Sequence, residues 1–324
     1  MPEVSPSVLI IRLDAIGDAL ALAPLLAFLR SREIPVDVVL RRANAGVFAA
    51  RAVRDVKVAG FELRSSTKEN VEAIDAFGAS LRAGAYTHVL VATEDPGGYR
   101  LAGAVGAPVR VGFADARGKP LKALWSRAFL TDTVYRSAGL DPRAPHECEV
   151  LFSLGASLTG RAAPTRDAVQ LRPLVLEREV ERQDHVAVQI TQKWERLGIP
   201  RGDLISLVRR AAHATDLRLL CARSEAPYAK TISDATGMEI AYFDELEPWK
   251  NAIGAAAALV APDSGAMHVA GTIGTPVVAI FPPSREYDLQ VARWAPWAAP
   301  HRIVCAQDDW PARASDALAA LLSV

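Results

Sequence analysis

Aspartate, serine, glycine and histidine lie close together between Val260 and His268, with types and spacing that could bind an anionic ligand. An apolar strand is followed by a turn of Asp263, Ser264 and Gly265 and then by an Ala-rich helix whose first turn carries His268. A helix start of this kind presents free backbone N–H groups and the positive end of the helix dipole. The segment therefore predicts an anion site above the end of a strand.

A second turn with a reactive side chain lies near the amino terminus. The apolar run 8–11 leads into a polar turn around Gly17 that ends in Asp18, and a helical stretch follows from 19 to 30. A carboxylate at a strand-to-helix turn can act as a general base toward a bound hydroxyl. From the residue types alone, capping of the following helix is the favoured explanation of Asp18.

Strand-like and helix-like segments alternate along the chain, which is typical of parallel, doubly wound α/β sheets. Prolines bracket the stretch 142–172, where the pattern weakens, so we expect two such domains in tandem with a ligand cleft at the carboxyl ends of their strands. The first series has strands at 8–11, 36–40, 88–92 and 109–113 and helices at 19–30, 71–82 and 100–105. The second has strands at 185–190, 217–222, 239–242, 258–261 and 277–281 and helices at 202–215, 226–236, 247–257 and 267–273.

The composition is that of a globular protein and narrows the functional classes. The chain has 324 residues, 50% of them hydrophobic, so two domains with substantial cores are expected. The 37 basic residues balance 37 acidic ones, which argues against nucleic acid as a partner. Three isolated cysteines predict neither disulfides nor a zinc site and fit a reducing, cytoplasmic compartment. The longest early apolar run, 19–29, is too short to span a membrane, and we expect no signal peptide.

Several motifs together resemble glycosyltransferase family nine, the lipopolysaccharide heptosyltransferases. The resemblance covers nearly the whole chain and is strongest in the Gly17-Asp18 turn and the Asp263-Ser264-Gly265 turn. It implies GT-B architecture, in which two Rossmann-like domains face each other across a cleft, an inverting mechanism, and a nucleotide-activated heptose donor, usually ADP-heptose. The other matching pieces are 10–18 followed by Pro24, Lys193-Trp194, Glu225, His268 with 274–276, 86–91, 110–113 and His146.

The resemblance also implies a division of labour between the domains. Residues 1–165 would bind the acceptor, and residues 166–305 would bind the nucleotide-sugar. The segment 306–324 would form a C-terminal helix that packs back on the N-terminal domain. Asp18 would be the general base, which takes the proton of the acceptor hydroxyl on the sugar face opposite the departing diphosphate.

Family members place a lysine on the donor phosphates, and Lys193 matches it, with Thr191 adding a hydroxyl to the same phosphates. Glu225 matches the glutamate that accepts hydrogen bonds from the ribose. Ile190 and Gln192 stand where the family has smaller or more polar residues, which leaves the details of phosphate contact open. A solvated surface lysine and a helix-capping glutamate are the structural alternatives.

In the second turn the resemblance implies contacts with the donor's phosphates and sugar. The Ser264 hydroxyl and the Gly265 amide would donate hydrogen bonds, and His268 would lie near the diphosphate. Because a carboxylate repels phosphate, we expect Asp263 to orient the loop itself. The structural alternative for His268 is a satisfied core residue, and only its spacing from the turn raises it above that.

Basic residues of the first domain are candidates for an anionic, lipid-linked saccharide acceptor, although scattered solvated arginines explain them equally well. The apolar tract 121–129 suggests peripheral contact with the cytoplasmic face of the inner membrane, with helix packing as the alternative. We expect a monomer. The basic group comprises Arg100, Arg110, Arg117, Lys119, Lys122 and Arg127, and Arg100, Lys119 and Lys122 are the acceptor-binding candidates.

No Asp-x-Asp signature and no group of histidines and carboxylates accompanies the cleft motifs. We therefore expect no tightly bound metal or cofactor, and Mg²⁺ would associate only loosely with the donor diphosphate. Three other functions stay open at this level. They are the same fold with another donor or with a protein or polymer acceptor, a non-catalytic nucleotide-sugar-binding protein, and an epimerase of the UDP-sugar type.

Overall fold

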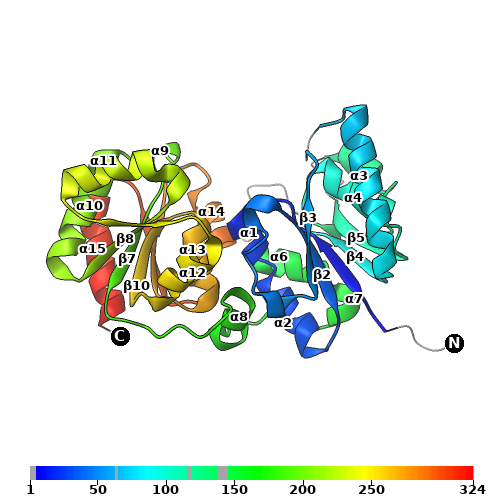
Figure 1. The fold of residues 1–324 in the computed structure, drawn as a ribbon, viewed down its shortest axis with the longest axis horizontal. Helices are drawn as coiled ribbons and strands as arrows, with labels where there is room; N and C mark the ends of the chain where they lie inside the picture. The colour runs from blue at the N-terminus through cyan, green and yellow to red at the C-terminus, as the bar shows by residue number, and fades with distance from the viewer. Residues whose placement is uncertain (1–4, 63–64, 115–118, 137–144, 324) are drawn as a thin grey trace. The chain divides into compact units, whose positions relative to one another are not determined.

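A computed structural model describes residues 5–62, 65–114, 119–136 and 145–323. The chain divides into two compact units, Met1–Thr165 and Arg166–Val324. Each unit is built on one six-stranded sheet whose strands are all parallel and which is covered by helices (Figure 1). The division falls within the proline-bracketed stretch, at the position where the sequence indicates a change of domain.

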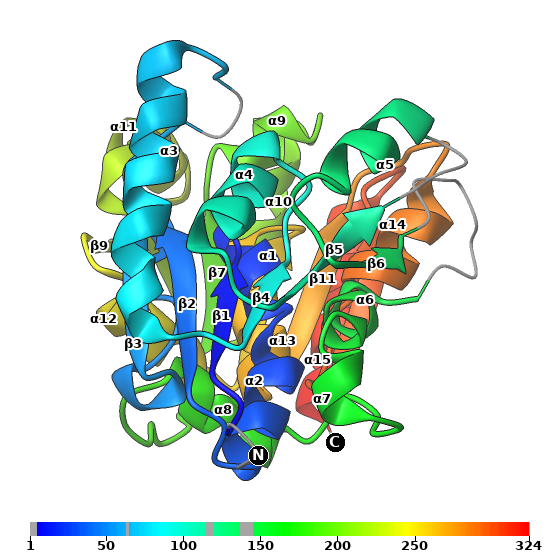
Figure 2. The same ribbon diagram turned by 90° about the vertical axis from the view of Figure 1, so that its right-hand side faces the viewer.

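The first unit has the strand order β3-β2-β1-β4-β5-β6, which Figure 2 shows from one edge to the other. The strands are β1 (Val8–Ile11), β2 (Val36–Arg41), β3 (Asp55–Ala59), β4 (His88–Val91), β5 (Val109–Ala114) and β6 (Asp132–Tyr135). The helices are α1 (Ile16–Leu20), α2 (Ala23–Ser31), α3 (Lys68–Leu81), α4 (Pro96–Val105), α5 (Pro120–Ser126), α6 (Glu147–Ser153) and α7 (Ala156–Thr159).

The middle of the first sheet explains where a ligand would bind. All four residues of β1 are buried, because the strand lies between β2 and β4 with helices on both faces. The chain runs from β1 outward to β3 and then returns to β4 on the other side of β1. Ligands of doubly wound sheets bind at such a reversal, outside the carboxyl ends of the strands. The turn with Asp18 follows β1 at this point.

The stretch predicted as one helix from 19 to 30 is two helices. Asp18 lies inside the short helix α1, and α2 starts afresh at Ala23 with Pro24 in its first turn. A proline inside a helix removes a backbone donor and clashes with the preceding turn. The break therefore places Pro24 where a helix tolerates it, and it separates α1, the short helix that carries Asp18, from α2.

The second unit repeats the architecture with the strand order β12-β11-β10-β7-β8-β9, so its reversal lies between β10 and β7. The strands are β7 (Val186–Ile190), β8 (Leu217–Ala222), β9 (Ile240–Phe243), β10 (Ala258–Pro262), β11 (Val277–Phe281) and β12 (His301–Cys305). The helices are α8 (Ala168–Val175), α9 (Lys193–Arg196), α10 (Arg201–Ala214), α11 (Ala226–Thr236), α12 (Leu246–Ala255), α13 (Gly265–Ile273), α14 (Tyr287–Trp294) and α15 (Trp310–Leu322).

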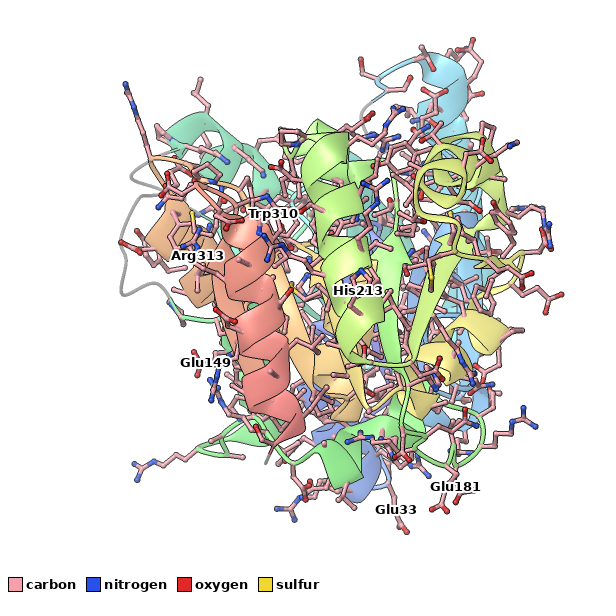
Figure 3. The ribbon with its side chains drawn as sticks, turned by 90° about the vertical axis from the view of Figure 1, so that its left-hand side faces the viewer. Glu33, Glu149, Glu181, His213, Trp310 and Arg313 are labelled. Carbon is pink, nitrogen blue, oxygen red and sulfur yellow. The ribbon has the colours of Figure 1, made fainter. Side chains whose placement is uncertain are left out.

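The C-terminal helix has contacts within the second unit. α15 is part of that unit, and the packing of segment 306–324 on the N-terminal domain stays a prediction. Helix α15 lies beside α10 over the second sheet, as Figure 3 shows. Trp310 is buried, stacks on Trp194 at 5.7 Å between ring centroids, and donates from Nε1 to Oδ2 of Asp203 on α10. Burial of this large aromatic ring on the second sheet holds the helix there.

Candidate active site

The donor-binding candidates of the second unit lie at the carboxyl ends of three neighbouring strands. Thr191 and Lys193 follow β7, Glu225 follows β8, and Asp263 follows β10. Since β10, β7 and β8 are adjacent in the sheet, their ends meet at one edge and at the reversal of strand order. The structure thus brings together residues that the sequence separates widely.

Asp263 lies between two basic side chains. Its Oδ2 is 3.9 Å from Nζ of Lys193, and its Oδ1 is 3.6 Å from Nε2 of His268. Burial alone would raise the pKa of Asp263, but the interactions with His268 and Lys193 hold this pKa below its usual range. The carboxylate therefore stays ionised, and it fixes two basic groups beside the start of α13.

The start of α13 carries an unusual hydroxyl. Ser264 is the residue before the helix, and its side chain does not cap the helix. Its Oγ is buried and has no hydrogen-bond partner among the described residues. A buried hydroxyl without a partner is costly, so it commonly marks a position that a ligand completes. The hydroxyl and the first free N–H groups of α13 lie beside the basic pair around Asp263.

Glu225 and Thr191 are connected to each other. Oε1 of Glu225 accepts hydrogen bonds from Oγ1 of Thr191 at 3.2 Å and from the backbone N–H of Gln192 at 3.1 Å. Oγ1 of Thr191 in turn accepts from the backbone N–H of Lys193. Glu225 also stands at the residue before α11, but it makes no side-chain cap there. Its carboxylate therefore orders the loop after β7 rather than the helix that follows it.

Three tryptophans support the same edge, and only Trp194 among them was singled out from the sequence. The ring of Trp294, at the end of α14, meets the His268 ring edge to face at 5.6 Å between centroids. Trp249 and Trp194 both donate from Nε1 to Gln189, to its side chain and its backbone oxygen respectively, at 2.9 Å. The sequence predicted that Gln189 lies in the strand 185–190. It did not predict these tryptophan contacts, because the tryptophans are far apart in the chain.

In the first unit, Asp18 is held by a buried arginine. Oδ1 of Asp18 accepts from Nη2 of Arg12 at 3.2 Å, and Oδ2 accepts from the backbone N–H of Ala15 at 3.1 Å. The second contact caps α1, the helix that contains Asp18, and not the helix predicted to follow it from 19 to 30. The Asp18 side chain remains 29% exposed. A carboxylate that is fixed on one side and open on the other has the geometry of a general base.

Asp14 shares the same arginine. Its Oδ2 lies 3.3 Å from Nη1 of Arg12. Burial raises the pKa of Asp14, and the charges of Asp18 and Asp95 raise it further, against the lowering effect of Arg12. The turn after β1 thus holds two carboxylates in different electrostatic surroundings around one cation.

The three acceptor-binding candidates do not gather in one place. Lys119 and Lys122 both contact Oε2 of Glu94, at 3.3 and 3.1 Å. Burial would raise the pKa of Glu94, yet Lys122, Arg136 and Lys119 hold it below its usual range. Arg100 instead forms a two-bond ion pair with Asp75 on α3.

Of the other basic residues, Arg110 donates to the backbone oxygens of Phe129 and Ala107, which is a structural role. Arg117 lies outside the described residues. Arg127 is exposed beside α5. On α5 itself Leu121, Leu124 and Trp125 are exposed by 82%, 68% and 40%, so the tract 121–129 keeps an apolar surface rather than burying it all.

A separate cavity of about 480 Å³ opens at the amino ends of β2 and β3, the edge opposite the Asp18 turn. Its buried carboxylate, Asp37, is bound by Arg54 through two hydrogen bonds of 2.8 Å and by the hydroxyl of Tyr86. Because Asp37, Arg54 and Tyr86 satisfy one another's charges and hydrogen bonds, we interpret this cluster as one that stabilises the fold. The lining residues are Asp37, Arg54, Asp55, Lys57, Ser80, Leu81, Ala83, Gly84 and Tyr86.

Among the described residues, no group of three or more histidines, cysteines and carboxylates is arranged to hold a metal ion. Within the same part of the chain, no helix has the length and apolar character needed to cross a membrane.

Comparison with known proteins finds one family model that matches part of the chain. Residues 210–320 match the model of glycosyltransferase family 9 (heptosyltransferase), whereas no curated protein matches the chain. Among solved structures, a family 9 glycosyltransferase from Veillonella parvula DSM 2008 is 14% identical, with 98% of this chain and 97% of that chain covered and a TM-score of 0.75.

Two Escherichia coli structures are similar over the same 98% of this chain. ADP-heptose LPS heptosyltransferase II is 17% identical, is covered over 98% and gives a TM-score of 0.71. Heptosyltransferase WaaC with ADP is 18% identical, is covered over 99% and gives a TM-score of 0.69. The predicted α/β fold of the GT-B kind is confirmed, and the match over residues 210–320 supports the predicted resemblance to family 9 glycosyltransferases. The donor, the acceptor, the domain roles and the site residues stay predictions.

Proposed function

We propose that this chain, whose residues 210–320 match the model of glycosyltransferase family 9, moves a heptose from ADP-heptose to a hydroxyl of a lipopolysaccharide inner-core acceptor with inversion. The observation that carries the proposal is the edge where Lys193, Asp263 and His268 surround the start of α13, beside the unpartnered Ser264 hydroxyl. Such an edge suits a diphosphate. ADP is taken as the nucleotide because the similar Escherichia coli enzyme WaaC is described with ADP.

The donor would use the described contacts as follows. The diphosphate accepts hydrogen bonds from the Ser264 hydroxyl and the Gly265 amide and is neutralised by Lys193 and His268. The ribose hydroxyls donate to Glu225, whose Oε1 already orders the loop after β7. Thr191 adds a hydroxyl to the phosphate side of the same loop. Asp263 touches no phosphate, and it holds the two basic side chains in place.

The transfer step balances with one base and one leaving group. Asp18 takes the proton of the acceptor hydroxyl while the hydroxyl oxygen forms a bond to the anomeric carbon of the donor. The bond between that carbon and the diphosphate oxygen breaks on the opposite face, and its electron pair leaves with ADP. Lys193, His268 and the start of α13 stabilise the charge that develops there. The residues require no metal for this step, and Mg²⁺ would accompany the diphosphate only loosely.

The acceptor is proposed to be an anionic, lipid-linked saccharide that meets the first unit. Lys119 and Lys122 gather around Glu94, and an anionic group of the acceptor could replace that carboxylate. The exposed Leu121, Leu124 and Trp125 on α5 fit peripheral contact with a membrane that carries the acceptor. A cytoplasmic monomer without nucleic acid as a partner completes the proposal.

Calorimetric titration of the purified protein with ADP, UDP, GDP and ADP-heptose tests the donor. Preference for ADP and ADP-heptose, followed by heptose transfer to a deacylated inner-core acceptor, supports the proposal. Preference for UDP or GDP would reassign the donor or favour an epimerase-like role. Tight ADP-heptose binding without transfer to any inner-core acceptor would point to a nucleotide-sugar-binding protein instead.

A further inference from the structure

The buried guanidinium of Arg12 contacts several groups around Asp18. Arg12 is only 2% exposed. Its Nε donates to the backbone oxygen of Asp18, its Nη1 donates to the backbone oxygen of Ala92, and its guanidinium also meets Asp14 and Asp18 through their carboxylates. The position and charge of this guanidinium therefore control how strongly the Asp18 carboxylate is held.

A third carboxylate competes for the same nitrogen. Glu147, the first residue of α6, is fully buried, and its Oε1 lies 3.5 Å from Nη2 of Arg12. The same Nη2 donates to Asp18 at 3.2 Å. Oε1 of Glu147 has no hydrogen bond among the described residues, so its charge is compensated on that side only by this ion pair. If Glu147 loses its other partner, its buried charge depends more strongly on the ion pair with Arg12.

The other partner of Glu147 is Arg136, which connects it to charged groups beyond the surroundings of Asp18. Oε2 of Glu147 accepts a hydrogen bond from Nη2 of Arg136 at 2.8 Å. Nε of Arg136 lies 3.5 Å from Oε1 of Glu94, and Oε2 of Glu94 meets Lys119 and Lys122. The ion pairs thus continue without a gap from the lysines beside α5, through alternating negative and positive groups, to the arginine that holds Asp18.

We propose that Glu94, Arg136, Glu147 and Arg12 form a relay of ion pairs through which the charge around Lys119 and Lys122 sets how firmly Arg12 holds Asp18. The importance of Asp18 rests on the proposed function, whereas the relay is a property of the first unit alone. Glu147 and Arg12 act in it as positioning residues.

The relay has a direction. An anionic group that binds Lys119 and Lys122 takes them from Glu94, so Glu94 draws Arg136 toward itself. Glu147 then depends more on Arg12, and the hold of Arg12 on Asp18 weakens. Asp18 becomes a stronger base when the acceptor's anionic group arrives. The base would thereby be activated only with an acceptor in place.

Carboxyl ¹³C NMR titration of the full-length protein labelled at its aspartates tests the relay without any substrate. The Asp18 signal is assigned by its loss in Asp18→Asn. Glu94→Gln frees Arg136 for Glu147, so the titration midpoint of Asp18 falls, on the order of half a pH unit. The groups facing Asp18 are Arg12, Asp14 and the Ala15 amide, with Asp95 acting on Asp14, and none of them is altered.

The decisive comparison repeats Glu94→Gln in a Glu147→Gln background. If the effect travels through Glu147, the second variant removes it. An undiminished shift in the double variant would mean that Glu94 acts directly through space, and it would overturn the relay. Glu72→Gln, which breaks an exposed ion pair with Lys68 in the same unit, is the matched control and leaves the midpoint unchanged in either case.

Glu147 is buried, so its variant needs a safeguard against misfolding. Arg136→Met serves as an alternative block, because Arg136 is the step before Glu147 and is 15% exposed at its side chain. The effect of Glu94→Gln must vanish in that background too, and its persistence overturns the relay. The two proposals fail separately, since a protein that transfers no heptose can still show the coupled titration, and an active enzyme can lack it.

Discussion

Nε2 of His268 lies 3.6 Å from Oδ1 of Asp263, at the turn between β10 and α13. The other oxygen of the same carboxylate lies 3.9 Å from Nζ of Lys193, which follows β7. One ionised side chain thus joins basic groups from two neighbouring strand ends. This arrangement explains why a carboxylate belongs in a loop that is proposed to hold phosphate, and it has a consequence that can be measured.

Asp263→Asn is expected to weaken ADP binding by about tenfold, equivalent to ~1.4 kcal/mol, because Lys193 and His268 lose the group that positions them. Loss of the negative charge alone would have the opposite effect, because removal of a negative group strengthens the binding of an anion. The ADP affinity measured by calorimetry therefore distinguishes loss of positioning from loss of charge. The pKa of Asp263 is held below its usual range, so its titration does not contribute to binding near neutral pH. Tighter ADP binding by the variant would rule out the positioning role.

Ser264→Ala is expected to weaken ADP binding about five- to tenfold while leaving the stability of the free protein unchanged or slightly higher. The buried Oγ has no hydrogen-bond partner among the described residues, so its removal costs no bond in the free state. In the complex the hydroxyl is proposed to donate to the diphosphate. Calorimetry measures the ADP affinity of the variant, and thermal unfolding of the same samples measures its stability. A stability loss with normal affinity would mean that Ser264 has a structural role.

Asp18→Ala is expected to reduce heptose transfer by about 10³-fold, within the usual range for loss of a general base, while ADP-heptose affinity stays within a few-fold. The reason is that Asp18 is proposed to contact the acceptor hydroxyl, whereas the proposed donor contacts are residues of the second unit. Single-turnover transfer assays and calorimetry check it. Asp75→Asn, which removes a carboxylate from the ion pair with Arg100, is a control for lost charge in the same unit. Transfer near the wild-type rate in Asp18→Ala would remove it from the mechanism.

Asp37→Asn is expected to destabilise the first unit by about 1–3 kcal/mol near neutral pH, since Arg54 and Tyr86 lose a charged partner. Burial alone would raise the pKa of Asp37, but the hydrogen bonds from Arg54 and Tyr86 and the charges of Arg54 and Lys57 together lower it below 3.8. A lowered folded-state pKa means that the stabilisation is fully present above 3.8 and is lost as the pH falls through the folded-state value. Urea unfolding of both proteins should therefore show a gap that closes under acidic conditions. A gap that stays constant with pH would show that the carboxylate charge is not responsible.

Replacement of Leu121 and Leu124 by serine is expected to reduce binding to vesicles of anionic lipid several-fold without affecting ADP binding. The two side chains are 82% and 68% exposed on α5, next to basic residues. Vesicle flotation checks the loss. Val169→Ser, which removes an apolar side chain that is 80% exposed in the second unit, is the matched control. Equal flotation of all three proteins would argue against α5 as a membrane-contacting surface.

Much of the sheet architecture could be predicted because buried parallel strands are continuous apolar runs. The predicted segments 8–11, 217–222 and 277–281 coincide with β1, β8 and β11. The strands that were missed, β3, β6 and β12, are half-exposed and carry charged residues. β3 and β6 are the two edge strands of the first sheet, and β12 is an edge strand of the second. An edge strand has a neighbouring strand on one side only, so its run of apolar residues is weaker.

The strand-to-helix turns could be predicted from consecutive residues. Asp263-Ser264-Gly265 leads into α13, whereas the polar turn predicted after β1 ends earlier, because Gly17 and Asp18 already lie inside α1. Only the tertiary structure decided that Asp263 joins Lys193 to His268, that Glu94 gathers Lys119 and Lys122, and that Arg12 links Asp18 to Glu147. Apart from the pairs Asp263–His268 and Arg12–Asp18, those contacts join residues distant in the chain. Parallel strands bring their carboxyl ends to one edge, an arrangement that no local pattern encodes.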